Sequence, residues 1–166
     1  VFVDIKEDDF NMNSAELKKK ITKKTRAIII VHLYGNPADI VEISKVAKKN
    51  KVYLIEDCSQ AHGAEFNKKK VGTFGDLSCF SFYPTKNLST FGDAGIVCTN
   101  NKKMFKKIKF FREYGWKKKN IGVSEGYNKR LDELHAGILN VKLDNIDKFN
   151  KKRISIANKF FNLIKS

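Results

Sequence analysis

Two residues, Lys86 and Asp57, have the types and spacing that allow covalent chemistry with a bound aldehyde. Lys86 follows the apolar run at 80–83, whose alternation of phenylalanine with small residues is typical of buried sheet. A lysine in an apolar pocket holds a neutral amine more readily than a solvated lysine does, and a neutral amine condenses with an aldehyde into a Schiff base. The alternative is a surface lysine whose aliphatic stem lies along the end of a strand.

Asp57 ends a second apolar run, at residues 53–57. Ligands of open α/β sheets collect at the carboxyl ends of strands, so we expect Asp57 and Lys86 to face one crevice. A carboxylate beside a Schiff-base lysine is the pair that pyridoxal 5′-phosphate (PLP) requires, because the acid keeps the pyridine nitrogen protonated and the ring an electron sink. Taken alone, an aspartate at a strand end is more often a cap or turn residue.

The elements that must position these residues alternate between strand and helix. This rhythm predicts an α/β fold with a mostly parallel sheet flanked by helices, in which residues 96–99 form an antiparallel member. The apolar stripe Leu134, Ile138, Val141 and Ile146 indicates one long helix, and residues 116–124 are expected to form a surface loop. The remaining strands are expected at 1–5, 26–33, 52–55 and 77–83, and the helices at 14–22, 40–47, 102–114 and 131–147.

Four segments, in this order along the chain, resemble motifs of one enzyme family. The segments are VHLYGNPADI, LIEDCSQAHGAE, GTFGDLSCFSFYPTKNLSTFGDAGIV and GYNKRLDELHAGIL. They are similar to the PLP-dependent nucleotide-sugar aminotransferases of the DegT/StrS family, which are fold-type-I enzymes, and the likeness runs from about residue 1 to 166. Four motifs in family order are far more specific than a single short pattern.

The resemblance implies that this chain is a fragment of a longer enzyme. Residues 1–125 correspond to part of the PLP-binding large domain, and residues 126–166 to connecting helices that lead to a smaller C-terminal domain. The expected missing front contains a Gly-Thr helix start for the cofactor phosphate and an aromatic side chain that stacks on the ring. We therefore expect weak or absent turnover from these 166 residues alone.

Carried over from the family pattern, four residues would hold the cofactor. Lys86 would form the Schiff base and then shuttle the proton between the substrate carbon and the cofactor, and Asp57 would pair with the pyridine nitrogen. Gln60 would contact the phenolic oxygen of the ring, and Ser81 would donate a hydrogen bond to the phosphate. Without the family, Gln60 is a surface helix residue and Ser81 fills a small gap in a strand.

Further positions would serve the substrate and the partner subunit. Asn128 matches an asparagine that reaches the phosphate of the neighbouring subunit, which implies a homodimer with shared active sites. His32 and Tyr34 lie at a strand end on the edge of the expected site, and they and Arg130 are candidates for substrate contact. His62 is expected to be a structural hydrogen-bonding residue.

The implied reaction is a two-stage transamination in amino-sugar and polysaccharide biosynthesis. The amino donor is expected to be glutamate, and the acceptor is a nucleotide-linked keto sugar. The motif Arg130-Leu131-Asp132-Glu133-Leu134 favours a 3-keto-6-deoxyhexose over a 4-keto sugar. Some relatives have histidine in place of the lysine and perform dehydration, whereas Lys86 favours amino transfer.

Composition leaves two other classes open: a non-catalytic remnant of such an enzyme, and a basic binding module. A formal net charge of +15 invites binding to nucleic acid, but the lysines are spread along the chain without a nucleic-acid motif, so no nucleic-acid partner is expected. No apolar run reaches the length of a membrane span and no signal peptide opens the chain, which predicts a cytoplasmic protein. The three cysteines, without metal-ligand spacing, are expected to be reduced thiols.

Overall fold

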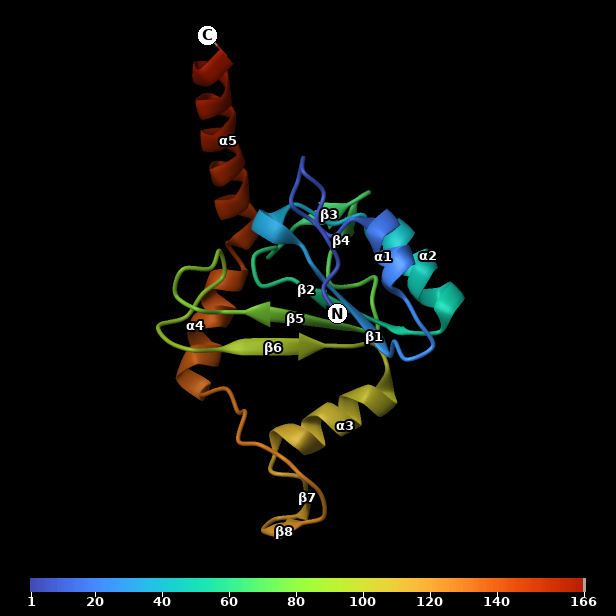
Figure 1. The fold of residues 1–166 in the computed structure, drawn as a ribbon. Helices are drawn as coiled ribbons and strands as arrows, with labels where there is room; N and C mark the ends of the chain where they lie inside the picture. The colour runs from blue at the N-terminus through green and yellow to red at the C-terminus, as the bar shows by residue number, and fades with distance from the viewer. Residues whose placement is uncertain (166) are drawn as a thin grey trace.

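A mixed four-stranded sheet forms the centre of the molecule (Figure 1), in a computed structural model that describes residues 1–165. Its order is β1-β2-β5-β6, in which β1, β2 and β5 are parallel and β6 is antiparallel. The predicted α/β class, the mostly parallel sheet and the antiparallel last strand are therefore confirmed. The bounds are β1(Ala27–Val31), β2(Tyr53–Asp57), β5(Leu77–Ser81) and β6(Gly95–Cys98).

One face of the sheet is covered because apolar residues alternate along the strands. Ile28, Ile30 and Leu54 are buried against the helices α1(Ser14–Lys20) and α2(Ile40–Asn50). Helix α2 presents the predicted apolar face to this core, with Ile40, Ile43, Val46 and Ala47 all buried. Farther along, Phe80 and Phe82 pack against Leu139 and Ile146 of the last two helices.

The opposite face of the sheet is open. Ile29 and Tyr53 alternate with the buried residues and keep 60% and 55% of their surface exposed, and Val97 of β6 keeps 45%. Because side chains alternate along a strand, Asp57 and Ser81 belong to this open face, whereas Glu56 points into the covered one. The sheet therefore separates two adjacent carboxylates, Glu56 and Asp57.

The final helical region is two helices rather than one. The predicted helix at 131–147 breaks between α4(Glu133–Leu143) and α5(Ile146–Lys165), and α5 projects away from the body of the molecule (Figure 1). The predicted stripe is wrong in detail, since Leu134 and Val141 are exposed and Leu139 is the buried residue of α4. None of the helices formed by residues 1–165 is both long and apolar enough to cross a membrane.

Other differences are local. The predicted strand at residues 1–5 is wrong, because only Ile5 forms a bridge, to Met12. Residues 116–124 contain a short hairpin, which projects beyond α3(Lys102–Arg112) in Figure 1. The hairpins are β3(Glu65–Phe66) with β4(Lys69–Lys70), and β7(Trp116–Lys118) with β8(Ile121–Gly122).

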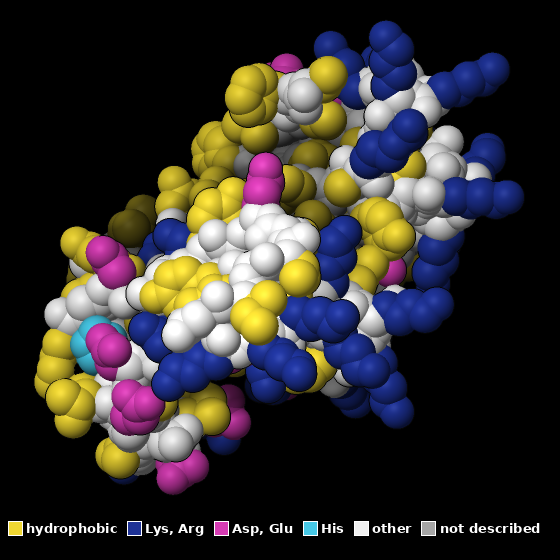
Figure 2. Space-filling model, turned by 90° about the horizontal axis from the view of Figure 1, so that it is seen from below, with side chains coloured by type: hydrophobic (Ala, Val, Ile, Leu, Met, Phe, Trp, Pro, Cys, Tyr) yellow, Lys and Arg dark blue, Asp and Glu magenta, His cyan; other side chains and the backbone are white. Residues whose placement is uncertain are grey.

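Lysine and arginine side chains crowd one side of the molecule in the view of Figure 2, and acidic side chains gather on the other side of that view. The lysines of the last turns of α1 and α2 and most of those of α3 are exposed, so the net charge of +15 is a property of solvated helix surfaces.

Candidate active site

The parallel strands β1, β2 and β5 all end at one edge of the sheet. Asp57 is the last residue of β2, Ser81 is the last residue of β5, and Lys86 follows five residues later. Since parallel neighbours end on the same side, the sheet brings Asp57, Ser81 and the start of the loop that contains Lys86 to one edge. The residues that follow β1, including Tyr34 in the 3-10 turn η1(Leu33–Gly35), lie beyond the end of the neighbouring strand.

Asp57 presents a carboxylate that is only partly satisfied. Its Oδ1 accepts a hydrogen bond of 2.9 Å from the backbone N–H of Ser59, whereas Oδ2 has no hydrogen bond or ion pair among residues 1–165. The side chain is half-buried on the open face of the sheet. A free carboxylate oxygen in this position can accept a hydrogen bond from a protonated ring nitrogen.

Ser81 lies on the same face as Asp57. Asp57 is paired with Cys79, and Ser81 is two residues farther along β5, so both side chains leave the sheet in the same direction. The Oγ of Ser81 accepts the backbone N–H of Tyr83 at 3.3 Å, which leaves the hydroxyl proton available to donate.

Lys86 closes a turn, in which its backbone N–H donates to the carbonyl of Tyr83 at 2.9 Å. The residue is half-buried rather than enclosed in the apolar pocket that the sequence suggested. Within the described part of the chain, its Nζ atom makes no hydrogen bond or ion pair, and in particular none with Asp57. The amine of Lys86 is therefore uncommitted, like Oδ2 of Asp57.

His62 lies close enough to Lys86 to sense its charge. Burial lowers the pKa of His62, the nearby backbone carbonyl of Ser81 opposes this effect, and the positive charge of Lys86 adds to it. The ring packs between Phe80 and Phe82, with centroids 5.7 Å and 5.8 Å away. His62 is therefore a buried packing residue, but the hydrogen bonds that we expected of it are absent, because neither ring nitrogen has a hydrogen-bond partner within residues 1–165.

Gln60 connects two loops at the same edge. Its Oε1 accepts the backbone N–H of Tyr34 at 2.8 Å, which holds Tyr34 in the left-handed region with φ of 57°. The Nε2 group of Gln60 remains free to donate to a ligand oxygen, and the side chain of Tyr34 is 76% exposed.

His32 has a structural position, and this corrects the expectation that it contacts substrate. The residue is fully buried, its Nδ1 accepts the backbone N–H of Ala38 at 3.1 Å, and its Nε2 lies 3.1 Å from Glu56. Because Nδ1 is an acceptor, the ring proton must be on Nε2 and is donated to Glu56. Both ring nitrogens are therefore occupied away from the open face.

Glu56 is the residue of this region that the sequence analysis missed. Its buried carboxylate accepts four hydrogen bonds: from His32 and from the backbone N–H groups of Gly72, Phe74 and Gly75. Burial acts to raise the pKa of Glu56, but these hydrogen bonds outweigh it and the net pKa is lowered. A charged residue inside the apolar run at 53–56 was the available signal.

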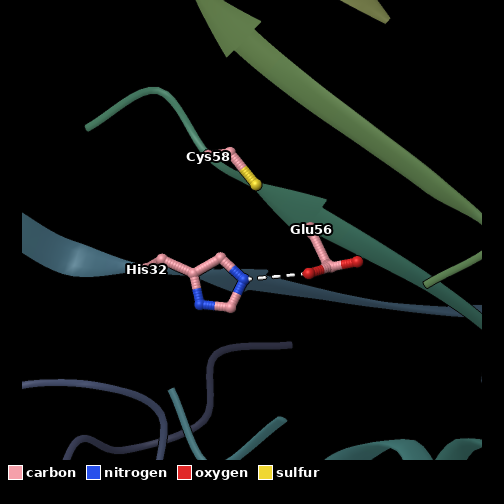
Figure 3. Close-up of side chains that lie close together, drawn as sticks. All are labelled: His32, Glu56 and Cys58. Carbon is pink, nitrogen blue, oxygen red and sulfur yellow. Dashed lines mark hydrogen bonds and ion pairs between the residues drawn. The ribbon is translucent and has the colours of Figure 1, made fainter. Parts of the chain in front are cut away.

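Figure 3 shows Glu56 and His32 beside Cys58, a group whose ligand-type atoms all lie within 4.8 Å of one another. The group does not fit a metal ion, because His32 has no free lone pair and the carboxylate of Glu56 already accepts four N–H donors. Burial and the charges of Glu56 and Asp57 raise the pKa of the Cys58 thiol, so it stays protonated. Within residues 1–165 the three cysteines are free thiols, as expected.

Asn128 and Arg130 do not join this edge. Both are exposed in the segment between β8 and α4, below the sheet in Figure 1, and the Nε of Arg130 donates to Oδ1 of Asn128 at 3.2 Å. Asn128 forms a bridge to Glu113 at the end of α3. Their predicted roles in phosphate and substrate binding stay predictions.

A mostly parallel sheet with helices packed on it defines an α/β protein, and the carboxyl ends of its strands are where ligands of such sheets collect. The whole chain, residues 1–166, matches the model of the DegT/DnrJ/EryC1/StrS aminotransferase family, and the chain belongs to that family. The match confirms the resemblance of the four sequence motifs to this family.

Individual relatives agree in fold. The chain is 44% identical over 154 residues to the UDP-N-acetyl-3-dehydro-alpha-D-glucosamine 3-aminotransferase of Acidithiobacillus ferrooxidans, covering 92% of this chain and 42% of the relative. The crystal structure of S. venezuelae DesV in complex with a ketimine intermediate has a TM-score of 0.93 at 36% identity, covering 98% of this chain and 44% of that one. The Escherichia coli GDP-4-keto-6-deoxy-D-mannose-3-dehydratase with bound hydrated PLP has a TM-score of 0.91 at 28% identity, covering 99% and 47%. The chain therefore spans less than half the length of these relatives.

Proposed function

We propose that this chain forms the lysine-bearing part of an active site that moves an amino group onto a nucleotide-linked keto sugar with PLP. The observation that supports the proposal most strongly is the placement of Asp57, Ser81 and Lys86 at one sheet edge, with a free carboxylate oxygen, a free hydroxyl proton and a free amine. The family and its solved members with PLP indicate pyridoxal phosphate as the cofactor.

The donor set at this edge fits PLP. Oδ2 of Asp57 would accept the N–H of the protonated pyridine nitrogen, and the hydroxyl of Ser81 would donate to the phosphate. The free amide N–H of Gln60 would donate to the phenolic oxygen of the ring. When bound, PLP supplies the electron sink that stabilises negative charge on the substrate carbon.

Lys86 would have two tasks in this reaction. Its amine would bind the cofactor covalently in the resting enzyme and then, once released, would hold and move the proton at the substrate carbon. Proton transfer needs an amine that is not locked into an ion pair, and the Nζ of Lys86 has no such partner within residues 1–165. Asp57 would hold the proton on the pyridine nitrogen.

The finer assignment concerns substrate and assembly. We propose glutamate as the amino donor and a 3-keto-6-deoxyhexose as the acceptor sugar, with Tyr34 and Arg130 as candidate substrate contacts. Support comes from the Arg130–Leu134 motif and from a relative whose name specifies a 3-dehydro sugar. We also propose a homodimer in which Asn128 reaches the partner's site, because Asn128 is exposed and belongs to the segment between β8 and α4, which runs below the sheet in Figure 1.

Incubation of the chain with PLP, followed by borohydride reduction and peptide mapping, tests the proposal. We expect preferential labelling of Lys86, loss of that label in Lys86→Ala, and no loss in Lys106→Ala, which removes an exposed lysine of α3. Uniform labelling of surface lysines would contradict the proposal. Salt-sensitive binding to nucleic acid without selective labelling would instead favour the basic binding module.

A further inference from the structure

The loop that contains Lys86 is fastened by the last two helices of the chain. On the far side of Lys86, Asn87 Nδ2 donates to Oδ1 of Asn150 in α5 at 3.2 Å. Lys142 of α4 then donates from Nζ to the carbonyl of Ser89 at 2.6 Å and to its hydroxyl at 2.9 Å. Leu88, between these contacts, is buried with Leu139 and Ile146.

Asn150 uses both ends of its amide. While Oδ1 accepts from Asn87, Nδ2 donates to the backbone carbonyl of His62 at 2.8 Å. His62 belongs to the loop that follows β2, which also contains Gln60. One half-buried side chain of α5 therefore joins the loop after β2 to the loop after β5, although the two loops are distant in sequence.

The packing around this contact is close. Gly63 has φ of +82°, and a Cβ atom placed there would lie 2.8 Å from Nδ2 of Asn150, so the approach of α5 requires glycine at this position. Lys70 adds a second tie, because its Nζ donates to the Gly63 carbonyl at 3.2 Å and lies 3.6 Å from Asp147 of α5.

We propose that Asn150 is a positioning residue that holds the Lys86 loop against the Gln60–Gly63 loop and so sets the place of the Lys86 amine relative to Asp57. Asp57 is fixed by the β2 ladder, but Lys86 lies outside β5 and depends on contacts beyond the strand. The positioning role rests on the proposed function. The two hydrogen bonds of Asn150, to Asn87 and to His62, form a clamp between the two loops that does not depend on that function.

The test uses the full chain with four single variants and one double variant, Asn87→Ala with Asn150→Ala. Asn150→Ala removes both hydrogen bonds of Asn150. Asn150→Asp keeps an acceptor for Asn87 but loses the donor to the His62 carbonyl. Asn87→Ala removes the donor of the hydrogen bond between Asn87 and Asn150. Asn158→Ala is the matched control, an exposed asparagine of α5. Hydrogen exchange is measured in residues 58–64 and 83–90, with 27–31 and 40–50 as internal references.

We expect Asn150→Ala to accelerate exchange roughly tenfold in both loops, as loss of one or two net hydrogen bonds would, while the reference segments and Asn158→Ala stay unchanged. Asn150→Asp should accelerate the loop at 58–64 and leave the loop at 83–90 close to wild type. Unchanged exchange at 83–90 in Asn150→Ala, or equal acceleration in the reference segments, would overturn the clamp.

A second readout measures the PLP concentration that half-labels Lys86 before borohydride reduction. This concentration should rise roughly tenfold in Asn150→Ala and in Asn87→Ala, with no further rise in the double variant because both act on one contact. If wild type labels Lys86 and Asn150→Ala does so equally, the positioning role fails and the proposed function stands. If wild type does not label Lys86, the proposed function fails, and hydrogen exchange still decides whether the clamp exists.

Discussion

Glu56 and Asp57 are neighbours in sequence with opposite environments. Glu56 points into the covered face and accepts four N–H donors, whereas Asp57 lies on the open face and keeps one oxygen uncommitted. A carboxylate with every lone-pair direction occupied holds structure together, and a carboxylate with a free oxygen can bind a ligand. The alternation of a strand is enough to separate these two roles.

The titration of His62 should report the charge of Lys86. Burial lowers the pKa of His62 and the Lys86 charge adds to this, so Lys86→Met should raise the His62 pKa while leaving it below its ordinary value of 6.5. A proton NMR titration of the His62 ring measures this shift. Lys106→Met on α3 is the matched control, and an equal shift in that control would contradict the proximity of Lys86 to His62.

The lowered pKa of His62 should also make the stability of the wild-type chain depend on pH. Because the folded pKa of His62 lies below 6.5, the unfolded chain binds a proton more readily than the folded chain does. The free energy of unfolding should therefore decrease as the pH falls from about 6.5 towards the folded pKa.

Sequence patterns predicted individual elements better than their tertiary partners. The apolar runs located β1, β2 and β5, and the parallel order followed from their alternation with helices, so Asp57 and Ser81, which end β2 and β5, lie at one edge of the sheet. His32 was placed wrongly, because a histidine at a strand end has the same local pattern whether it faces a ligand or a buried glutamate. Contacts such as Asn87 with Asn150 join residues 63 positions apart and leave no local signal.

Among the elements, Glu56 ties the loop at 72–75 to β1 and β2, and its removal should be costly. Each oxygen of the Glu56 carboxylate accepts two N–H hydrogen bonds. In Glu56→Gln, an NH₂ group replaces one of these oxygens, so two of the N–H groups would face another donor. We expect a loss of roughly 2 to 4 kcal/mol in unfolding free energy, measured by urea denaturation. Glu42→Gln, which removes a partner of Lys18 at the surface, should leave the unfolding free energy close to that of wild type.

The pH dependence of the Glu56 contribution has a definite sign. The folded pKa of Glu56 is below its ordinary value of 4.5, so its stabilisation is fully present above about pH 4.5 and is lost as the pH falls through the folded pKa. Wild type should lose stability across this acid range more steeply than Glu56→Gln. Parallel stability curves for the two proteins would contradict the arrangement of hydrogen bonds around Glu56.

At the scale of the whole molecule, the open sheet face and the exposed apolar residues of α5 leave large surfaces uncovered within residues 1–165. Phe160, Phe161 and Ile164 are each more than 60% exposed, and the chain spans less than half the length of the relatives described above. Exposed apolar side chains gathered on one surface are typical of contacts with further protein. A second copy of the chain, as in the proposed homodimer, would cover part of these surfaces.

Mixing of two inactive variants tests shared sites in a chain extended by its natural flanking sequence. Lys86→Ala and Asn128→Ala should each capture PLP poorly, whereas hybrid dimers should contain one site with both residues intact. We expect the refolded mixture to recover up to a quarter of wild-type labelling at Lys86, because about half of randomly assorted dimers are hybrids with one intact site. Labelling no greater than the sum of the separate variants would contradict the role of Asn128 across the interface.

We propose that Lys86 and Asp57 serve the same cofactor molecule. PLP labelled with ¹⁵N in the pyridine ring, fixed to Lys86 with borohydride, reports the protonation of that nitrogen by NMR. We predict a protonated nitrogen at pH 8 in wild type and a deprotonated one in Asp57→Asn, with Glu113→Gln, which changes a carboxylate at the end of α3, unchanged from wild type. A nitrogen whose protonation is the same in wild type and in Asp57→Asn would show that Asp57 is not its partner.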